Sequence, residues 1–206
     1  MKSLFGDKEF NTKHKLGAVN SINWARILAQ TVYYFSAYFQ ARKSLGVSEN
    51  EKVHLQFVVP TGNFGDILAG YYAKKMGLPM EGKLGVATNA NDILARFWKT
   101  GRYEKVDSSV VEVKQASRDT SGVKETMSPA MDILVSSNFE RLLWYLAFET
   151  LSGQTQDRRD KAGQIINEWM GKMKTDGKVE VPVEVLEAGR RDFCAERVSD
   201  EEVSLL

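Results

Sequence analysis

The most apolar stretch of the chain predicts a long helix from Ser21 to about Arg42. Apolar residues fall on nearly every face of such a helix, so the stretch lacks the polar stripe of an ordinary surface helix. Asn20 or Ser21 is suited to begin it, because a side-chain oxygen there accepts an otherwise unpaired backbone N–H. We therefore expect a helix that is covered by protein on all sides.

Strands and helices are predicted to alternate between residues 53 and 101. Continuous Val and Phe residues before Pro60 are typical of a strand that is buried on both faces of a sheet. Strands that alternate with helices form parallel sheets, so the predicted fold class is α/β, a parallel sheet wrapped by helices. The predicted elements are strands at 53–59 and 84–88 and helices at 67–76 and 93–99.

The second half of the chain predicts further helices around one exposed loop. Residues 106–126 are rich in Ser, Lys, Asp and Glu and predict that loop. Ser128 followed by Pro129 predicts a helix start. The remaining predictions are an apolar segment at 131–151 divided at Ser136–Asn138, a polar linker at 152–160, an amphipathic helix at 162–174, and a helix or pair of turns at 183–194.

The last residues of the sequence contain a helix-start signal. Ser199 and Glu202 have the spacing of a capping box, in which each side chain bonds the backbone N–H of the other residue. One turn is too short to be a stable helix by itself. This signal and the apolar helix after Ser21 predict that the chain is part of a larger fold; a chance match in a frayed tail is the alternative for the capping box.

The candidate chemistry lies at the turn from the first predicted strand into the following helix. Gly62, Asn63, Phe64 and Gly65 can offer backbone N–H groups there, and the helix start adds unpaired donors and a positive dipole end. This arrangement favours a phosphate monoester. Asp66 would repel phosphate, so we expect it to cap the helix or order the loop. A tight turn that needs its glycines only for shape is the alternative.

Composition excludes several other functions. The chain of 206 residues has a net charge of +1, which argues against an extended basic surface for binding nucleic acid. No apolar run is long enough to cross a membrane, and the first residues lack the apolar core of a signal peptide, so we expect a cytoplasmic protein. Spacings typical of metal sites are absent, and Cys194, the single cysteine, predicts no internal disulfide.

Long runs of the sequence resemble the threonine synthase family of the fungal type. The resemblance extends in order from about Leu4 to Val203 and is highly specific because several of the runs are long. The runs are Phe5–Phe10, Gly17–Gln30, Phe57–Pro79, Asn91–Leu94 and Ser128–Trp144.

The resemblance implies a pyridoxal-phosphate fold similar to that of tryptophan synthase β, with residues 1–206 forming a partial cofactor-binding region. It implies conversion of O-phospho-L-homoserine and water into L-threonine and phosphate, a carbon–oxygen lyase reaction for which the cofactor is the electron sink. The family's glycine-rich cofactor loop matches Gly62, Asn63, Phe64 and Asp66 directly, and Gly65 fits the same loop.

The same resemblance places the lysine that holds the cofactor covalently before residue 1, in a Phe-Lys-Asp motif that this sequence lacks. We therefore expect no catalytic residue in this chain and no activity from it alone. A non-catalytic short form that binds a phosphorylated ligand or a protein partner is the alternative. Asn20, Ser21 and Asn23 either face the active site or cap the following helix.

Overall fold

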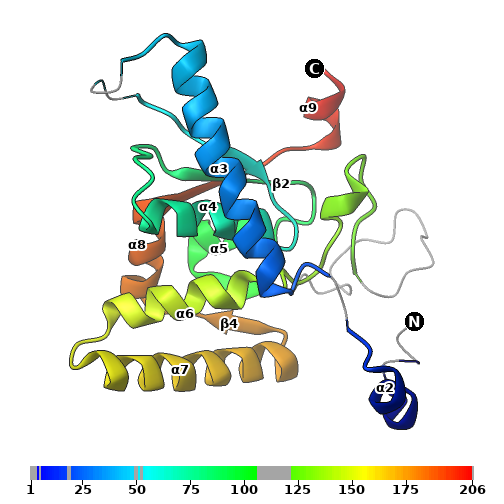
Figure 1. Cartoon of the computed structure of the whole chain (residues 1–206). Helices are drawn as coiled ribbons and strands as arrows, with labels where there is room; N and C mark the ends of the chain where they lie inside the picture. Colours follow the sequence, from blue (N-terminus) through cyan, green and yellow to red (C-terminus); the bar gives the residue numbers. More distant parts are fainter. Residues whose placement is uncertain are drawn as a thin grey trace.

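The computed structural model describes residues 4, 6–17, 20–48, 51, 53–105 and 122–205 (Figure 1). Most of the predicted loop at 106–126 lies outside these residues; its last part, 122–126, contains no helix or strand. The elements in order are α2 Lys8–His14, α3 Trp24–Ser44, β1 Val58–Pro60, α4 Gly65–Lys75, β2 Leu84–Thr88, α5 Ile93–Thr100, β3 Arg102–Glu104, the 3₁₀ turn η1 Pro129–Met131, α6 Phe139–Thr150, α7 Thr155–Thr175, β4 Lys178–Glu180, α8 Val183–Asp192, β5 Phe193–Arg197 and α9 Asp200–Ser204.

A three-stranded sheet in the order β1-β2-β5 organises the described structure, and both of its strand pairs are parallel. The register aligns Val59 with Val86 and Val86 with Ala195. The predicted α/β class with a parallel sheet is therefore confirmed. The strand at 84–88 and the helix that ends before Gly101 are also found as predicted, the latter with Gly101 in the left-handed conformation.

The first strand differs from its prediction in length and in burial. Residues 53–57 form no strand in the described structure, although the Phe57 carbonyl accepts from the Gly85 N–H of β2 at 2.8 Å. Strand β1 contains only Val58, Val59 and Pro60. It forms an edge of the described sheet. Successive side chains point to opposite faces, so Val59 is buried in the core while Val58, on the other face, is 64% exposed. The run of Val and Phe residues reflects contact with the core rather than a strand covered on both faces. Pro60 fits this position because edge strands tolerate proline.

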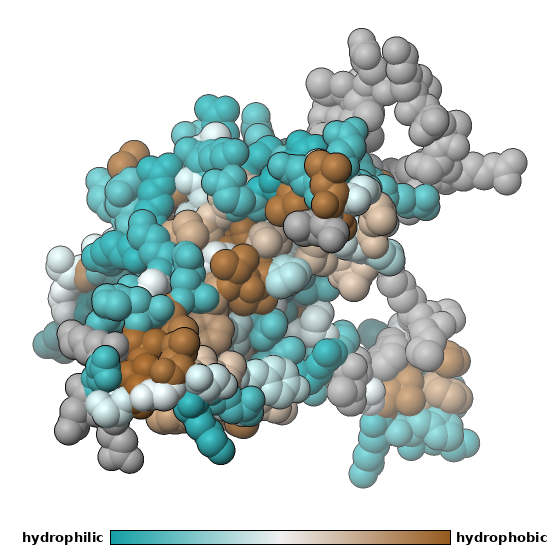
Figure 2. Space-filling view, turned by 90° about the horizontal axis from the view of Figure 1, so that it is seen from above, coloured by the Kyte–Doolittle hydropathy of each residue, from teal (hydrophilic) through white to brown (hydrophobic). Residues whose placement is uncertain are grey.

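The apolar helix is present as α3 but is buried along one face only. Ile27 and Tyr34 lie on the inner face, against α4. The outer face exposes large apolar side chains, with Trp24 56% and Phe39 61% exposed. The described structure therefore covers only one face of this helix, which agrees with the prediction that the chain is part of a larger fold. Figure 1 shows α3 lying across α4, and Figure 2 shows apolar patches among the hydrophilic side chains on one face of the molecule.

The core is centred on aromatic rings from several elements. Phe64 lies between Trp98 of α5, Phe139 at the start of α6 and Phe193 of β5, with ring centroids 5.2–6.0 Å apart. Phe139 also meets Phe97, at 4.9 Å. All but Trp98 are at most 1% exposed, and Trp98 is 5% exposed. Buried rings of this size dominate the apolar stabilisation of a core.

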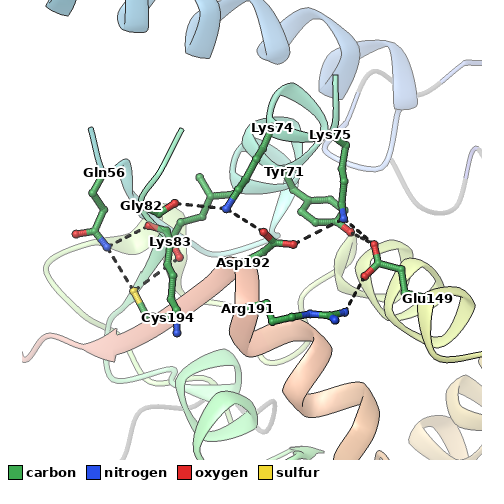
Figure 3. Close-up of polar contacts among 11 residues, drawn as sticks. Gln56, Tyr71, Lys74, Lys75, Gly82, Lys83, Glu149, Arg191, Asp192 and Cys194 are labelled. Atoms are coloured by element: carbon green, nitrogen blue, oxygen red, sulfur yellow. Dashed lines mark hydrogen bonds and ion pairs between the residues drawn. The ribbon is translucent and has the colours of Figure 1, made fainter. Parts of the chain in front are cut away.

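Charged side chains hold the far end of α4 to its neighbours (Figure 3). Lys74 pairs with Asp192 of α8 at 2.9 Å, and Lys75 pairs with Glu149 of α6 at 2.6 Å. Arg191 also reaches Glu149, at 3.2 Å. The carboxyl end of α4 is thus fixed by ion pairs, while its amino end is left open toward the loop after β1.

Several elements of the second half differ from their predictions, including strand β4, which was not predicted. Helix α7 begins at Thr155, inside the predicted polar linker, and the apolar segment opens with a 3₁₀ turn at Pro129 rather than an α-helix. Strand β5 at Phe193–Arg197 was not predicted as a strand; it pairs with β2. The capping box is confirmed: the Glu202 N–H donates to Ser199 Oγ at 3.2 Å, and the Ser199 N–H donates to Glu202 Oε2 at 2.7 Å.

Candidate functional site

The five predicted site residues lie together at the carboxyl end of β1, where the chain turns into α4. Ligands of open α/β sheets bind at this edge. A cavity of about 440 Å³ opens there, in the range of small-molecule sites. Its lining includes Gly62, Asn63, Phe64, Gly65 and Asp66 from the loop, Ser21, Arg26 and Gln30 from the α3 side, and Ala130 and Met131 from η1.

Gly62 is required by the close approach of another backbone segment. A Cβ at this position would lie 3.2 Å from Met131 Cα and 3.3 Å from the Ala130 carbonyl oxygen. Neither of those atoms is the end of a flexible side chain, so a larger residue would displace the loop or η1. The glycine therefore lets two walls of the cavity meet.

The left-handed conformation of the loop belongs to Phe64 and not to a glycine. Phe64 has a φ of 63°, a region that a bulky residue adopts only when its surroundings impose it. Its ring, 1% exposed, is enclosed by the aromatic core. The side chain thus anchors the loop from below, and only the backbone of Phe64 is available to a ligand. The interpretation that the glycines supply the tight turn is corrected in this respect.

Within the described ranges, the start of α4 leaves backbone donors without partners. The first intrahelical hydrogen bond runs from the Leu68 N–H to the Phe64 carbonyl, at 3.1 Å. The N–H groups of Gly65, Asp66 and Ile67 precede it and have no intrahelical acceptor. No side chain caps this end. These donors and the positive end of the helix dipole face a cavity, the arrangement that binds phosphate.

A polar turn before α6 holds the loop in place, and sequence reasoning recognised it only as a divider. Asn138, fully buried, donates through its side chain to the carbonyls of Asn63 and Ser21 at 2.9 and 2.8 Å. Ser136 Oγ donates to the Gly62 carbonyl at 2.8 Å. These bonds occupy the carbonyl groups of the loop, so its N–H groups remain for a ligand.

The Asn63 side chain is oriented by the same turn. Its Oδ1 accepts a hydrogen bond from Ser137 Oγ at 3.1 Å. No described residue accepts from its Nδ2, which is the atom that can donate to a phosphate oxygen or to a ring substituent. The predicted polar role of Asn63 is compatible with this geometry and stays a prediction.

Asp66 lies in the first turn of α4, where its carboxylate is exposed. Its backbone carbonyl accepts from the Tyr34 hydroxyl of α3 at 3.0 Å. Partial burial raises the pKa of the Asp66 carboxyl, and the Tyr34 hydroxyl opposes part of that shift. Asp66 is not the N-cap residue of α4, a position held by Phe64, so the expectation that Asp66 caps the helix is not met.

A second polar network fixes η1, the wall opposite Gly62. Asp132 accepts from Asn89 Nδ2 at 2.6 Å, Asn91 Nδ2 at 3.1 Å and Thr126 Oγ1 at 2.7 Å. Asn89 follows β2 directly and is buried. The carboxyl ends of both β1 and β2 therefore contribute to this edge of the sheet, the first through the loop and the second by holding its wall.

The three polar residues before α3 divide between two roles. Asn23 caps the helix by accepting from the Ala25 N–H at 2.9 Å, and Asn20 accepts from the Ile22 N–H at 3.1 Å. Ser21 lines the cavity, with its Oγ 3.4 Å from Ser137 Oγ. The cap is therefore Asn23 rather than Asn20 or Ser21, and Ser21 is the residue of the three that reaches the site.

The described lining offers hydrogen-bond donors for an anion but no amine that could bind a carbonyl cofactor covalently. It contains no lysine, histidine or cysteine. Across the described ranges there is no cluster of three or more His, Cys, Asp or Glu residues placed to hold a metal. Among the helices of that same part, none has both the length and the apolar character needed to cross a membrane.

The chain is similar to known proteins over nearly its whole length. No family model matches it. Threonine synthase of Saccharomyces cerevisiae is 56% identical over 204 residues, which cover 99% of this chain and 35% of the relative. Threonine synthase of Pseudomonas aeruginosa is 43% identical over 202 residues, covering 98% and 36% respectively. The chain thus spans about a third of the length of the curated relatives it matches.

Solved structures agree with these sequence matches. The crystal structure of threonine synthase from yeast has a TM-score of 0.82 at 54% identity, covering 99% of this chain and 35% of that one. The structure of pyridoxal-phosphate-bound threonine synthase from Brucella melitensis has a TM-score of 0.76 at 41% identity, covering 98% and 36%. The resemblance to part of a threonine synthase, predicted from the sequence, is confirmed in sequence and in fold.

Proposed function

We propose that this chain, which matches about a third of a threonine synthase, is the region that binds the phosphate group of pyridoxal phosphate. The whole enzyme then converts O-phospho-L-homoserine and water into L-threonine and phosphate, as a lyase of amino-acid biosynthesis in the cytoplasm. The cofactor supplies an electron sink for carbanions when it is bound. The residues of this chain bind, orient and enclose it.

One observation supports the proposal above the others: the unpaired N–H groups at the start of α4 open into the cavity, while the loop carbonyls are occupied by Ser136 and Asn138. A phosphate dianion accepts several hydrogen bonds, and helix starts of this kind hold phosphate. Gly62 allows the two walls to close, and Asn63 Nδ2 is placed to add one donor. The residues present therefore fit the phosphate of the cofactor.

The described lining does not supply the chemistry that follows binding. Since it contains no lysine and no acid–base pair, the chain alone binds without turning over substrate. We expect borohydride reduction of a mixture with pyridoxal phosphate to label exposed lysines at low occupancy, with no single stoichiometric site by peptide mapping. One fully labelled lysine, protected by O-phospho-L-homoserine, would contradict the absence of a catalytic residue.

The proposal is tested by binding of pyridoxine 5′-phosphate, which has the ring and phosphate but no aldehyde to react with surface lysines. Isothermal titration should show binding by the chain and at least tenfold weaker binding of pyridoxine, because the phosphate makes the charge-assisted contacts. Gly62→Ala should weaken phosphate binding about tenfold or more by displacing the loop from η1. Equal affinity for the two ligands would overturn the proposal.

Gly171→Ala provides the matched control. Gly171 lies in α7, and a Cβ there would meet no atom within 4 Å. The substitution should leave binding unchanged and stabilise the helix by roughly 0.5–1 kcal/mol. A loss of binding in both glycine variants would show that the effect of Gly62→Ala is not local to the loop.

A further inference from the structure

We infer that Arg141 is a positioning residue for phosphate binding: it fixes the Asn138 amide in the orientation that holds the loop at 62–66. The inference rests on the proposed function, since it assigns a part in that binding to a residue that does not meet the ligand. Arg141 lies in the first turn of α6 and is not among the described residues that line the cavity. It acts through Asn138, which is fully buried.

The Asn138 side chain holds the loop instead of capping its own helix. Asn138 occupies the N-cap position of α6, where an asparagine oxygen commonly accepts an N–H of the helix, but no side-chain cap bond is formed. The amide donates from Nδ2 to the carbonyls of Asn63 and Ser21, at 2.9 and 2.8 Å. The Asn138 backbone N–H donates to the same Asn63 carbonyl at 3.1 Å. Two donors from one residue therefore fix the direction of that carbonyl.

Arg141 determines which way round the amide lies. Its Nη1 donates to Asn138 Oδ1 at 2.9 Å, and its Nη2 donates to the Ile22 carbonyl at 2.7 Å. A guanidinium group has donors only, so the amide atom that faces it must be the oxygen. The Nδ2 atom is then directed at the two carbonyls. Both ends of the amide are bonded in this orientation, as a buried polar group requires.

The place of Arg141 in α6 supports a role in positioning rather than in helix stability. A cation in the first turn lies near the positive end of the helix dipole, which disfavours it. The contacts of the guanidinium must outweigh that cost. Its bond to Ile22 joins the start of α6 to the start of α3, and Figure 1 shows these two helix ends beside each other.

A displaced amide would move the donors of the phosphate site. The Asn63 carbonyl belongs to the same peptide group as the Phe64 N–H. Because a peptide group is planar, a turn of that carbonyl also turns the N–H. A Cβ on Gly65 would lie 3.4 Å from Asn138 Nδ2, so the amide also packs directly against the start of α4. The Arg141–Asn138 pair therefore sets the direction of a backbone donor that the phosphate meets.

The test is calorimetric titration of the 206-residue chain with pyridoxine 5′-phosphate, and with pyridoxine by displacement. Arg141→Met keeps the apolar stem and should weaken pyridoxine 5′-phosphate about tenfold, the loss expected for a charge-assisted hydrogen bond to a buried group. Pyridoxine affinity should change by less than about twofold, since only the phosphate meets the loop donors. The ratio of the two affinities decides, because a loss of folded protein alone would weaken both ligands equally.

Two further variants separate position from charge. Arg141→Lys keeps the charge but not the planar fork that reaches both acceptors, so it should still bind pyridoxine 5′-phosphate at least about threefold more weakly than the unaltered chain. In an Asn138→Ala chain, Arg141→Met should cause less than about a twofold further loss, because the amide through which it acts is gone. Where Asn138→Ala does not fold, the lysine variant still decides.

Arg159→Met is the matched control, because it removes an exposed arginine from α7. It should alter neither affinity. An unchanged affinity ratio in Arg141→Met, full affinity in Arg141→Lys, or a tenfold further loss in the Asn138→Ala chain would overturn the inference while leaving the cofactor site standing. Failure of the unaltered chain to bind pyridoxine 5′-phosphate would overturn the proposed function itself, and the inference with it.

Discussion

The two sides of α4 are built differently. On one side, α5, α6 and β5 enclose the ring of Phe64 in a closed aromatic core. On the other, α3 covers α4 with one face and exposes apolar side chains on its outer face. The candidate site lies between the two: its backbone is anchored in the closed side, and its Arg26 wall comes from the open side. A site can therefore be rigid although one of its supporting helices is only half buried.

The largest difference in stability is expected when one aromatic ring is removed from each side of α4. Phe64→Ala should lower the free energy of unfolding by about 3–5 kcal/mol, because it leaves a cavity in the core. Phe39→Ala, on the outer face of α3, should lower it by less than about 1 kcal/mol, since Phe39 is largely exposed. Urea denaturation followed by tryptophan fluorescence measures both.

Equal costs for the two variants would show that the outer face of α3 is covered in solution. Phe64→Leu separates the ring from the backbone, because it keeps an apolar side chain at the same left-handed position. If its cost approaches that of Phe64→Ala, the aromatic packing rather than volume alone holds the loop.

The contact between α3 and α4 provides the next test. A Cβ at Gly70 would lie 2.6 Å from Tyr34 Cε1, closer than carbon atoms approach. Gly70→Ala should therefore push the helices apart and lower stability by about 1–3 kcal/mol, although alanine favours a helix. Binding of pyridoxine 5′-phosphate should weaken with it, because α3 and α4 both line the cavity. The measurement is thermal unfolding combined with calorimetric titration of pyridoxine 5′-phosphate.

Gly163→Ala is the control for helix propensity, because a Cβ at Gly163 in α7 would meet no atom within 4 Å. It should raise the melting temperature slightly. An equal rise in Gly70→Ala would mean that the Tyr34 ring moves aside without cost, and that the open side is less firmly attached than its geometry indicates.

The same contrast explains which parts of the fold were predictable. The loop at 62–66 follows an apolar run and leads into a helix. Its position at a sheet edge could therefore be predicted from the local sequence alone. Strand β5 contains Cys194, Glu196 and Arg197 and lacks a continuous apolar pattern. It is a strand because it pairs with β2, more than a hundred residues earlier in the chain. The local sequence pattern of β5 cannot reveal a partner strand so far away in the chain.

The polar residues of the site show the same limit. Ser136, Ser137 and Asn138 were recognised as a break between apolar segments, which is what three small polar residues indicate locally. Their bonds to Gly62 and Asn63 join positions about 75 residues apart. The left-handed φ of Phe64 could not be predicted either, because a sequence pattern assigns such angles to glycine. The packing of its ring in the aromatic core overrides that preference.

The smallest expected effect concerns the charge of Asp66. Burial raises the pKa of this carboxyl, so its ionised form is disfavoured in the folded chain and would repel a phosphate at the start of α4. Asp66→Asn should tighten binding of pyridoxine 5′-phosphate at pH 7 by roughly twofold to fivefold, as expected for a solvent-screened like charge. The gain should vanish as the pH falls through the raised pKa, because the native carboxyl then becomes neutral.

The stability of the native chain relative to Asp66→Asn should change with pH in the same direction as its relative affinity. The native chain loses stability relative to Asp66→Asn as the pH rises from below the ordinary carboxyl pKa through the raised one. Asp157→Asn, which removes an exposed carboxylate from the first turn of α7, is the control and should leave the affinity ratio unchanged at every pH. Weaker binding in Asp66→Asn at pH 7 would instead assign the ionised carboxylate a positive role, as a group that orders the loop or accepts a hydrogen bond from the ligand.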